Sequence, residues 1–322
     1  MALMATTEAL IMTGTDMHSV ESAWMDLAVD EYITPTLGGH YTAIPVTTPE
    51  EFWPFGGVWD ETIDDSIAEG ISVIGIAVTD ALAGTAGSGD ARAQVVVFGY
   101  SQSAIIAALF KQRLAEATQA GQPSPAVTFV LIGNPTRPNG GLNARFPGLR
   151  LPGWTFYGPA PTDSGFVTID VARQYDPFAD FPQYPLNLFA LANAFAGLFY
   201  AHDYTKVTLD PADPGYNPAT EVQHFGDTTY YLIPAEHLPL LQPLWDLGFP
   251  AALLDRIEPP LRTLVEAGYD RTIPFGQPAP ARLSPIRVPL TTGSVGRIRR
   301  GGGFDRSSAT PVARERRTIS RH

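Results

Sequence analysis

Residues 95–98 are four apolar residues in a row. The sequence Gly-Tyr-Ser-Gln-Ser follows them directly and leads into a helical pattern. A buried strand that ends in glycine and continues as a helix must turn sharply, and that turn lifts one side chain above the sheet. The residue at this position is Ser101, in the spacing of a G-x-S-x-G nucleophile elbow whose last position is serine. We therefore expect Ser101 to be a nucleophile. Ser103 is the weaker candidate because it falls inside the helix.

Apolar runs of strand length alternate with longer helical patterns along the chain. Because these runs are continuously apolar, they indicate strands that are covered on both faces. The runs lie at residues 9–13, 41–46, 94–98, 127–132, 167–171 and 228–233. Helical patterns at residues 60–83 and 101–120 lie between them. This order predicts an α/β fold with a doubly wound parallel sheet, whose active site lies beyond the carboxyl ends of the strands.

The second half of the chain predicts a helical addition to this sheet. Residues 184–200 are apolar almost all round, and residues 238–268 carry five prolines that predict short helices. These segments are predicted either to belong to the core or to form a helical cap over the sheet. We expect a single domain at residues 1–280 and an arginine-rich, disordered tail at residues 281–322.

Charge and composition exclude several classes of function. Residues 297–322 hold eight arginines and two carboxylates, so the whole-chain net charge of −12 becomes −18 for residues 1–296. A body this acidic repels nucleic acid. The chain has no cysteine, and it has neither a glycine-rich nucleotide loop nor a metal-binding motif. We expect no cofactor and no metal. The N-terminal residues do not have the pattern of a signal peptide.

A serine nucleophile needs a histidine base and a carboxylate that orients the histidine, and in this architecture they follow in the order Ser, Asp, His. Asp176 follows the strand predicted near residue 170 and is our candidate acid, with Asp180 as the alternative. His237 directly follows the last predicted strand and is our candidate base. The competing histidines after Ser101 are His202, which ends an apolar helix, His224, which precedes the last strand, and His322, which lies in the tail.

The chemistry also needs donors for an oxyanion. One is usually the amide of the residue after the nucleophile, which is Gln102 here. The second is expected from Thr15, in a Thr-Gly-Thr-Asp loop after the first predicted strand. That loop is also compatible with a simple turn or a helix cap.

Several segments taken together resemble the PE-PPE domain of mycobacteria and related actinobacteria, over about residues 8–275. They are Thr-Gly-Thr at 13–15, Gly-Tyr-Ser-Gln-Ser at 99–103, Tyr-Asp-Pro-Phe-Ala-Asp-Phe-Pro at 175–182, Tyr-Pro-Leu-Asn at 184–187 and Glu-His-Leu-Pro-Leu-Leu at 236–241. This family is similar to the cutinases in fold. The resemblance implies a serine esterase with an α/β-hydrolase-like fold, secreted or associated with the cell envelope. The resemblance implies that Ser101 is the nucleophile, Asp176 the acid and His237 the base.

We therefore expect a serine carboxylesterase or lipase that hydrolyses acyl esters of short to medium chain length through an acyl-enzyme. One alternative is an acyltransferase or thioesterase with the same triad. The other is a catalytically silent hydrolase fold that binds lipid or protein.

Overall fold

The computed structural model describes residues 7–86 and 94–283. The chain divides into a unit Met1–Pro285 and a unit Ile286–His322, and the second unit lies outside the described residues. The predicted tail, residues 281–322, lies outside them from residue 284 onward. The domain boundary at residue 280 and the disorder of the tail therefore stay predictions.

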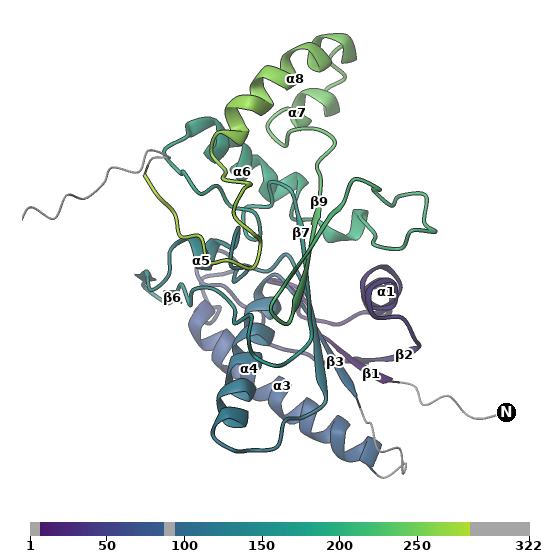
Figure 1. Ribbon diagram of the computed structural model, residues 1–322. Helices are drawn as coiled ribbons and strands as arrows, with labels where there is room; N and C mark the ends of the chain where they lie inside the picture. The colour runs from purple at the N-terminus through teal and green to yellow at the C-terminus, as the bar shows by residue number, and fades with distance from the viewer. Residues whose placement is uncertain (1–6, 87–93, 284–322) are drawn as a thin grey trace, which may run out of the picture. The chain divides into compact units, whose positions relative to one another are not determined.

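A seven-stranded sheet forms the centre of the described unit, in the order β2-β1-β3-β4-β7-β9-β8 (Figure 1). Its strands are β1 (Thr7–Ile11), β2 (Tyr41–Pro45), β3 (Val95–Tyr100), β4 (Val127–Ile132), β7 (Thr168–Arg173), β8 (Glu221–Phe225) and β9 (Thr228–Ile233). All neighbouring strands pair in parallel except β8, which pairs antiparallel with β9. The predicted α/β-hydrolase-like sheet is thus confirmed as a mostly parallel sheet between helices.

The continuous apolar runs arise because each inner strand is covered on both faces. In β3, Val95 and Val97 join the core under helices α3 (Ile63–Ala86) and α4 (Gln102–Gln119). Val96 and Phe98 point to the other face, where they meet Trp24 of α1 (Ser22–Leu27). Alternate residues of one strand therefore fill two separate cores. The chain after α1 continues through a π-helical segment, Ala28–Ile33, and the short helix α2 (Thr34–Leu37).

By length and composition alone, helix α3 is apolar enough to cross a membrane, but the core helix of a soluble protein can have the same length and composition. Ile67, Ile71 and Ile74 of this helix pack into the core shared with the sheet and α4. Its apolar composition is thus accounted for in part by packing.

A helical cap lies beyond the ends of β7 and β9 (Figure 1). It consists of α6 (Leu188–Tyr200), α7 (Gln242–Asp246) and α8 (Ala251–Glu266). These helices share a small apolar cluster, separate from the two sheet cores, which includes Ala190, Leu241 and Val265. Because this cluster is separate from the two sheet cores, it favours the prediction of a helical cap over the prediction that these segments belong to the core.

Three local features differ from the sequence-based expectation. Strand β8 and a short hairpin of β5 (Arg150–Leu151) and β6 (Trp154–Thr155) were not predicted. The short helix α5 (Leu142–Arg145) precedes that hairpin. Helix α8 continues through Pro259 and Pro260 instead of breaking there. Both prolines lie on its exposed side, where water can satisfy the carbonyl groups that lose their helical partners.

Candidate active site

Ser101 stands at a strained turn between β3 and α4. Its backbone has φ 55° and ψ −111°, which a residue with a side chain rarely adopts. The turn is tight because a Cβ on Gly99 would lie 2.6 Å from the Ser103 carbonyl oxygen. Ser103 Oγ accepts a hydrogen bond from the Tyr100 amide at 2.8 Å and is fully buried. Ser103 therefore holds the turn, whereas Ser101 presents its hydroxyl.

His202 is the histidine that contacts Ser101. Its Nε2 lies 2.9 Å from Ser101 Oγ, and its Nδ1 lies 2.9 Å from Oδ1 of Asp176. A carboxylate next to Nδ1 favours the tautomer that carries its proton there. The unprotonated Nε2 then accepts the serine hydroxyl.

The prediction that His237 lies over Ser101 is wrong. Its Nδ1 lies 3.1 Å from Oε2 of Glu258, and its ring stacks on Trp245 with the centroids 4.4 Å apart. The chain after β9 leads into the cap, so the imidazole packs between α7 and α8 instead of returning to the serine. The other competitor, His224, lies in strand β8, and its Nδ1 is 3.0 Å from Thr229 Oγ1.

Asp176 is fully buried and is surrounded by donors. Besides His202, the Tyr204 hydroxyl donates to Oδ2 at 2.7 Å and the Phe178 amide donates to Oδ1 at 2.8 Å. These bonds fix the plane of the carboxylate against the imidazole. Tyr204 also accepts a hydrogen bond from the Arg173 amide at the end of β7, at 3.0 Å. Burial raises the pKa of the Tyr204 phenol well above its usual range, so it stays a donor.

The alternative acid, Asp180, is engaged elsewhere. Its two carboxylate oxygens accept hydrogen bonds from the guanidinium of Arg271, at 2.6 and 3.0 Å. It also accepts a hydrogen bond from the Tyr175 amide at 2.9 Å. The structure therefore places Asp176 beside the imidazole and assigns Asp180 to an ion pair that ties the turn after β7 to the segment after α8.

Two glycines let His202 approach. A Cβ on Gly197 of α6 would lie 2.2 Å from the Tyr175 carbonyl oxygen, so only glycine lets this helix approach the turn after β7. The Gly197 carbonyl accepts hydrogen bonds from the amides of Ala201 and His202, at 2.7 and 3.0 Å. Gly133 follows β4 with φ 58°, and a Cβ there would lie 3.1 Å from the His202 ring.

Aromatic rings enclose the imidazole on several sides. Tyr100 stacks on it with the centroids 5.3 Å apart, and Phe178 lies at 4.5 Å. The Tyr100 hydroxyl donates to the His202 carbonyl oxygen at 2.6 Å. These contacts restrict the ring to the orientation that faces Ser101.

The predicted oxyanion donors lie side by side. Thr15 Oγ1 donates to Gln102 Oε1 at 2.9 Å, and a Cβ on neighbouring Gly14 would lie 3.3 Å from Ser101 Cβ. Among the described residues, the amides of Thr15 and Gln102 have no hydrogen-bond partner. The Gln102 amide is at the first turn of α4, where helix amides point toward a ligand. Two free donors thus lie beside the serine.

The loop that carries Thr15 rests on a buried acid. The Asp16 amide donates to the Glu50 carbonyl oxygen at 3.0 Å. The Glu50 side chain is fully buried, and burial raises the pKa of its carboxyl to about 8. The loop is therefore held by the backbone carbonyl of Glu50, and burial favours the neutral form of that residue's carboxyl.

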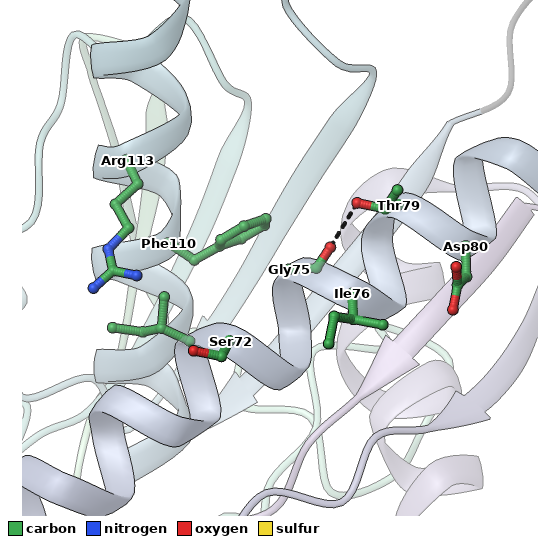
Figure 2. Close-up of a pocket in the computed structure, with 8 residues that line it drawn as sticks. Ser72, Gly75, Ile76, Thr79, Asp80, Phe110 and Arg113 are labelled. Atoms are coloured by element: carbon green, nitrogen blue, oxygen red, sulfur yellow. Dashed lines mark hydrogen bonds between the residues drawn. The ribbon is translucent and has the colours of Figure 1, made fainter.

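A cavity of about 430 Å³ lies away from Ser101, between α3 and α4. Figure 2 shows Arg113 and Phe110 of α4 facing Ser72, Gly75 and Ile76 of α3. None of the residues that surround Ser101 lines it. In the part of the chain that the structure describes, no cluster of histidine and carboxylate side chains has the arrangement of a metal site.

Sequence reasoning missed His202 and Tyr204. His202 and His237 both follow Asp176 and keep the order Ser, Asp, His, so the order alone could not separate them. The available signal was the apolar helix that precedes His202, since its Gly197 allows it to lie against the turn after β7, which carries Asp176.

Comparisons with known proteins agree on one family. The model of the PE-PPE domain matches residues 39–270. Esterase PE16 of Mycobacterium tuberculosis is 42% identical over 87% of this chain and 52% of its own length. The SL1278 acyltransferase Chp1 of the same organism is 31% identical over 78% of this chain and 57% of its own length.

Among solved structures, a cutinase-like protein from Cryptococcus sp. matches 55% of this chain and 82% of its own, with 20% identity and a TM-score of 0.34. The chain spans about half the length of the curated relatives it matches. The extent of the family match and the identity to these relatives show that the chain belongs to the PE-PPE domain family.

Proposed function

We propose that this chain is a serine carboxylesterase that hydrolyses acyl esters through an acyl-enzyme. The observation that carries the proposal is the chain of contacts from Ser101 Oγ to His202 Nε2 and from His202 Nδ1 to Asp176, each 2.9 Å long. A serine hydroxyl reacts with esters when a histidine accepts its proton and a carboxylate stabilises the imidazolium that forms. The esterase name of the relative PE16 supports the same activity.

In the first half of the reaction, Ser101 Oγ forms a bond to the ester carbonyl carbon while its proton passes to His202 Nε2. The carbonyl oxygen becomes an oxyanion that the Gln102 and Thr15 amides can bind. When the carbonyl re-forms, the alcohol leaves with the proton from His202, and an acyl group stays on the serine. Water then attacks that acyl group with His202 as the base again, which releases the acid and restores the serine.

Acyl esters are the proposed substrate class. A short to medium chain length, a lipid ester as the natural substrate and a location in the cell envelope are parts of this proposal. The acyl chain length rests on the apolar segments at residues 184–200 and 238–268, and the lipid ester and the location rest on the family.

A second candidate is acyl transfer, which the acyltransferase name of the relative Chp1 favours. The same acyl-enzyme would form, and an alcohol of an acceptor would then take the place of water. Incubation with a p-nitrophenyl ester and added trehalose or glycerol tests this. A transferred acyl product that exceeds the free acid supports transfer, and free acid alone supports hydrolysis.

The proposed function is tested by hydrolysis of p-nitrophenyl esters from two to sixteen carbons. Ser101→Ala and His202→Ala should each lower the rate by about 10⁴-fold or more. His237→Ala is the matched control, because that side chain is bound to Glu258 and does not reach the serine. A fluorophosphonate probe should label the wild type and not Ser101→Ala.

Two outcomes would overturn the proposal. If the folded wild type were no faster than Ser101→Ala on every ester and the probe failed to label it, a silent binding fold would replace the esterase. If His237→Ala lost activity and His202→Ala kept it, the assignment of the base would be wrong.

A further inference from the structure

Helix α6 has its large apolar side chains on the outside. The residues that it buries are small or polar, namely Ala190, Asn193, Ala194 and Gly197. The opposite face exposes 73% of Leu188, 66% of Phe195 and 74% of Phe199. A helix that covers a protein core normally has the reverse arrangement. The small inner face is explained by the close contact of Gly197 with the turn after β7, but that contact does not explain phenylalanines in solvent.

The neighbouring cap helix exposes a similar stripe. Leu253, Ile257 and Leu264 of α8 are each more than a third exposed, and their spacing places them on one side of the helix. Helix α6 is joined to α8 near its first residue and to α7 at its last residue. Asn187 Nδ2 donates to the Leu264 carbonyl oxygen at 2.7 Å, and the Tyr200 hydroxyl donates to Asp246, in α7, at 2.9 Å. Adjoining helices thus both expose apolar side chains. We use the term cap surface for the exposed residues Leu188, Phe195 and Phe199 of α6 and Leu253, Ile257 and Leu264 of α8.

The cap surface borders the candidate active site, because α6 ends two residues before His202. A second apolar segment borders the loop that carries Thr15. It exposes Phe55, Val58 and nearly all of Trp59. A Cβ on Gly56 in this segment would lie 2.5 Å from an Asp16 carboxylate oxygen, so the segment lies against that loop. Exposed apolar side chains therefore lie next to both the base and the oxyanion donors.

The charges determine which kind of surface can meet these residues. Leu188–Tyr200 has no charged side chain, and neither does the segment 52–59. The charges that adjoin the segment are the carboxylates of Glu51, Asp60 and Glu61. After α6, Asp203 is balanced by Lys206, whose Nζ lies 2.9 Å from its Oδ2, and on α8 exposed Asp255 is balanced by exposed Arg256. An anionic lipid head group would meet repulsion beside the segment, whereas an uncharged layer of acyl esters would not. Exposed apolar patches of this kind mark contacts with membranes or proteins.

We propose that the cap surface docks onto an uncharged lipid layer and holds the mouth of the active site against it. Burial of Phe195 and Phe199 among acyl chains supplies the attraction, and the carboxylates that flank residues 52–59 repel anionic layers. The choice of acyl esters as the layer rests on the proposed function. The docking itself does not require catalysis.

The test measures co-sedimentation with vesicles of phosphatidylcholine, using Ser101→Ala so that no ester is cleaved. The double variant Phe195→Ser/Phe199→Ser should bind at least tenfold more weakly, because each phenylalanine contributes a large buried area. Ile76→Ser is the matched control, since Ile76 is 64% exposed on the other long apolar helix, α3. Adding phosphatidylglycerol to the vesicles should weaken the binding of Ser101→Ala.

Equal binding of the double variant and Ser101→Ala would overturn the docking proposal, as would stronger binding to the anionic vesicles. A dimer in solution that the double variant dissociates would identify a second copy of the chain as the occupant and also overturn it. These readouts are separate from hydrolysis. Failure of the enzyme on soluble p-nitrophenyl esters would remove the proposed function while the vesicle result still stood.

Discussion

Gly197→Ala perturbs the position of the base without touching any group that reacts. The added Cβ would lie 2.2 Å from the Tyr175 carbonyl oxygen, where ordinary contact begins at about 3.4 Å. The added Cβ is fixed to the backbone of α6, and the oxygen that it meets belongs to the backbone of the turn after β7, so neither can rotate away. Helix α6 must therefore move outward by roughly 1 Å. Because the His202 amide is bonded to the Gly197 carbonyl, the imidazole moves with the helix.

That shift is enough to break the contact with the serine. A Ser101 Oγ to His202 Nε2 distance of 2.9 Å that grows by about 1 Å passes the limit of a hydrogen bond. Misplacement of this size costs about 10²-fold in rate. The overpacking costs about 1–3 kcal/mol of stability, and the better helix propensity of alanine offsets about 1 kcal/mol of it.

The assay is kcat on p-nitrophenyl butyrate together with the thermal midpoint. We expect kcat to fall about 10²-fold while the protein stays folded. Gly84→Ala is the matched control, since a Cβ there meets nothing within 4 Å in helix α3. An unchanged kcat in the folded Gly197→Ala protein would refute the argument that this glycine positions the base.

Two further predictions concern groups that support the site. Tyr204→Phe removes the hydroxyl that joins Asp176 to the Arg173 amide. Chemical denaturation should therefore show that the free energy of unfolding falls by about 1–3 kcal/mol, and kcat should fall by less than in His202→Ala. An unaltered stability would contradict the role of this bond. Burial raises the pKa of the Glu50 carboxyl from 4.5 to about 8. Above about pH 4.5 the folded state therefore holds a proton that the unfolded state has lost. Because of this difference, the stability of the folded state falls as the pH rises from about 5 to 8. In Glu50→Gln, thermal midpoints measured over that range should depend less on pH than in the wild type, and the same slope in both proteins would contradict the assignment.

The sheet and the nucleophile could be predicted because they depend on local patterns. The runs at residues 127–132 and 228–233 are the strands β4 and β9, residue for residue, since inner parallel strands must be apolar on both faces. Strand β8 could not be found in this way. Its sequence, Glu-Val-Gln-His-Phe, is mostly exposed at an edge, where pairing with β9 and not burial determines the strand.

The base was predicted wrongly because the order Ser, Asp, His does not distinguish a histidine that reaches Ser101 from one that does not. His202 and His237 both come after Asp176 and both follow elements that end near the same edge of the sheet. The difference between them is tertiary. At His202, the small residues of α6 allow the helix to lie against the turn after β7, and Gly133 leaves space for the ring. At His237, Glu258 of α8, 21 residues later in the chain, lies 3.1 Å away and takes Nδ1 as its partner. A glycine in an apolar helix that follows the candidate acid, five residues before a histidine, is therefore the more informative signal, because close helix packing places the imidazole beside the carboxylate.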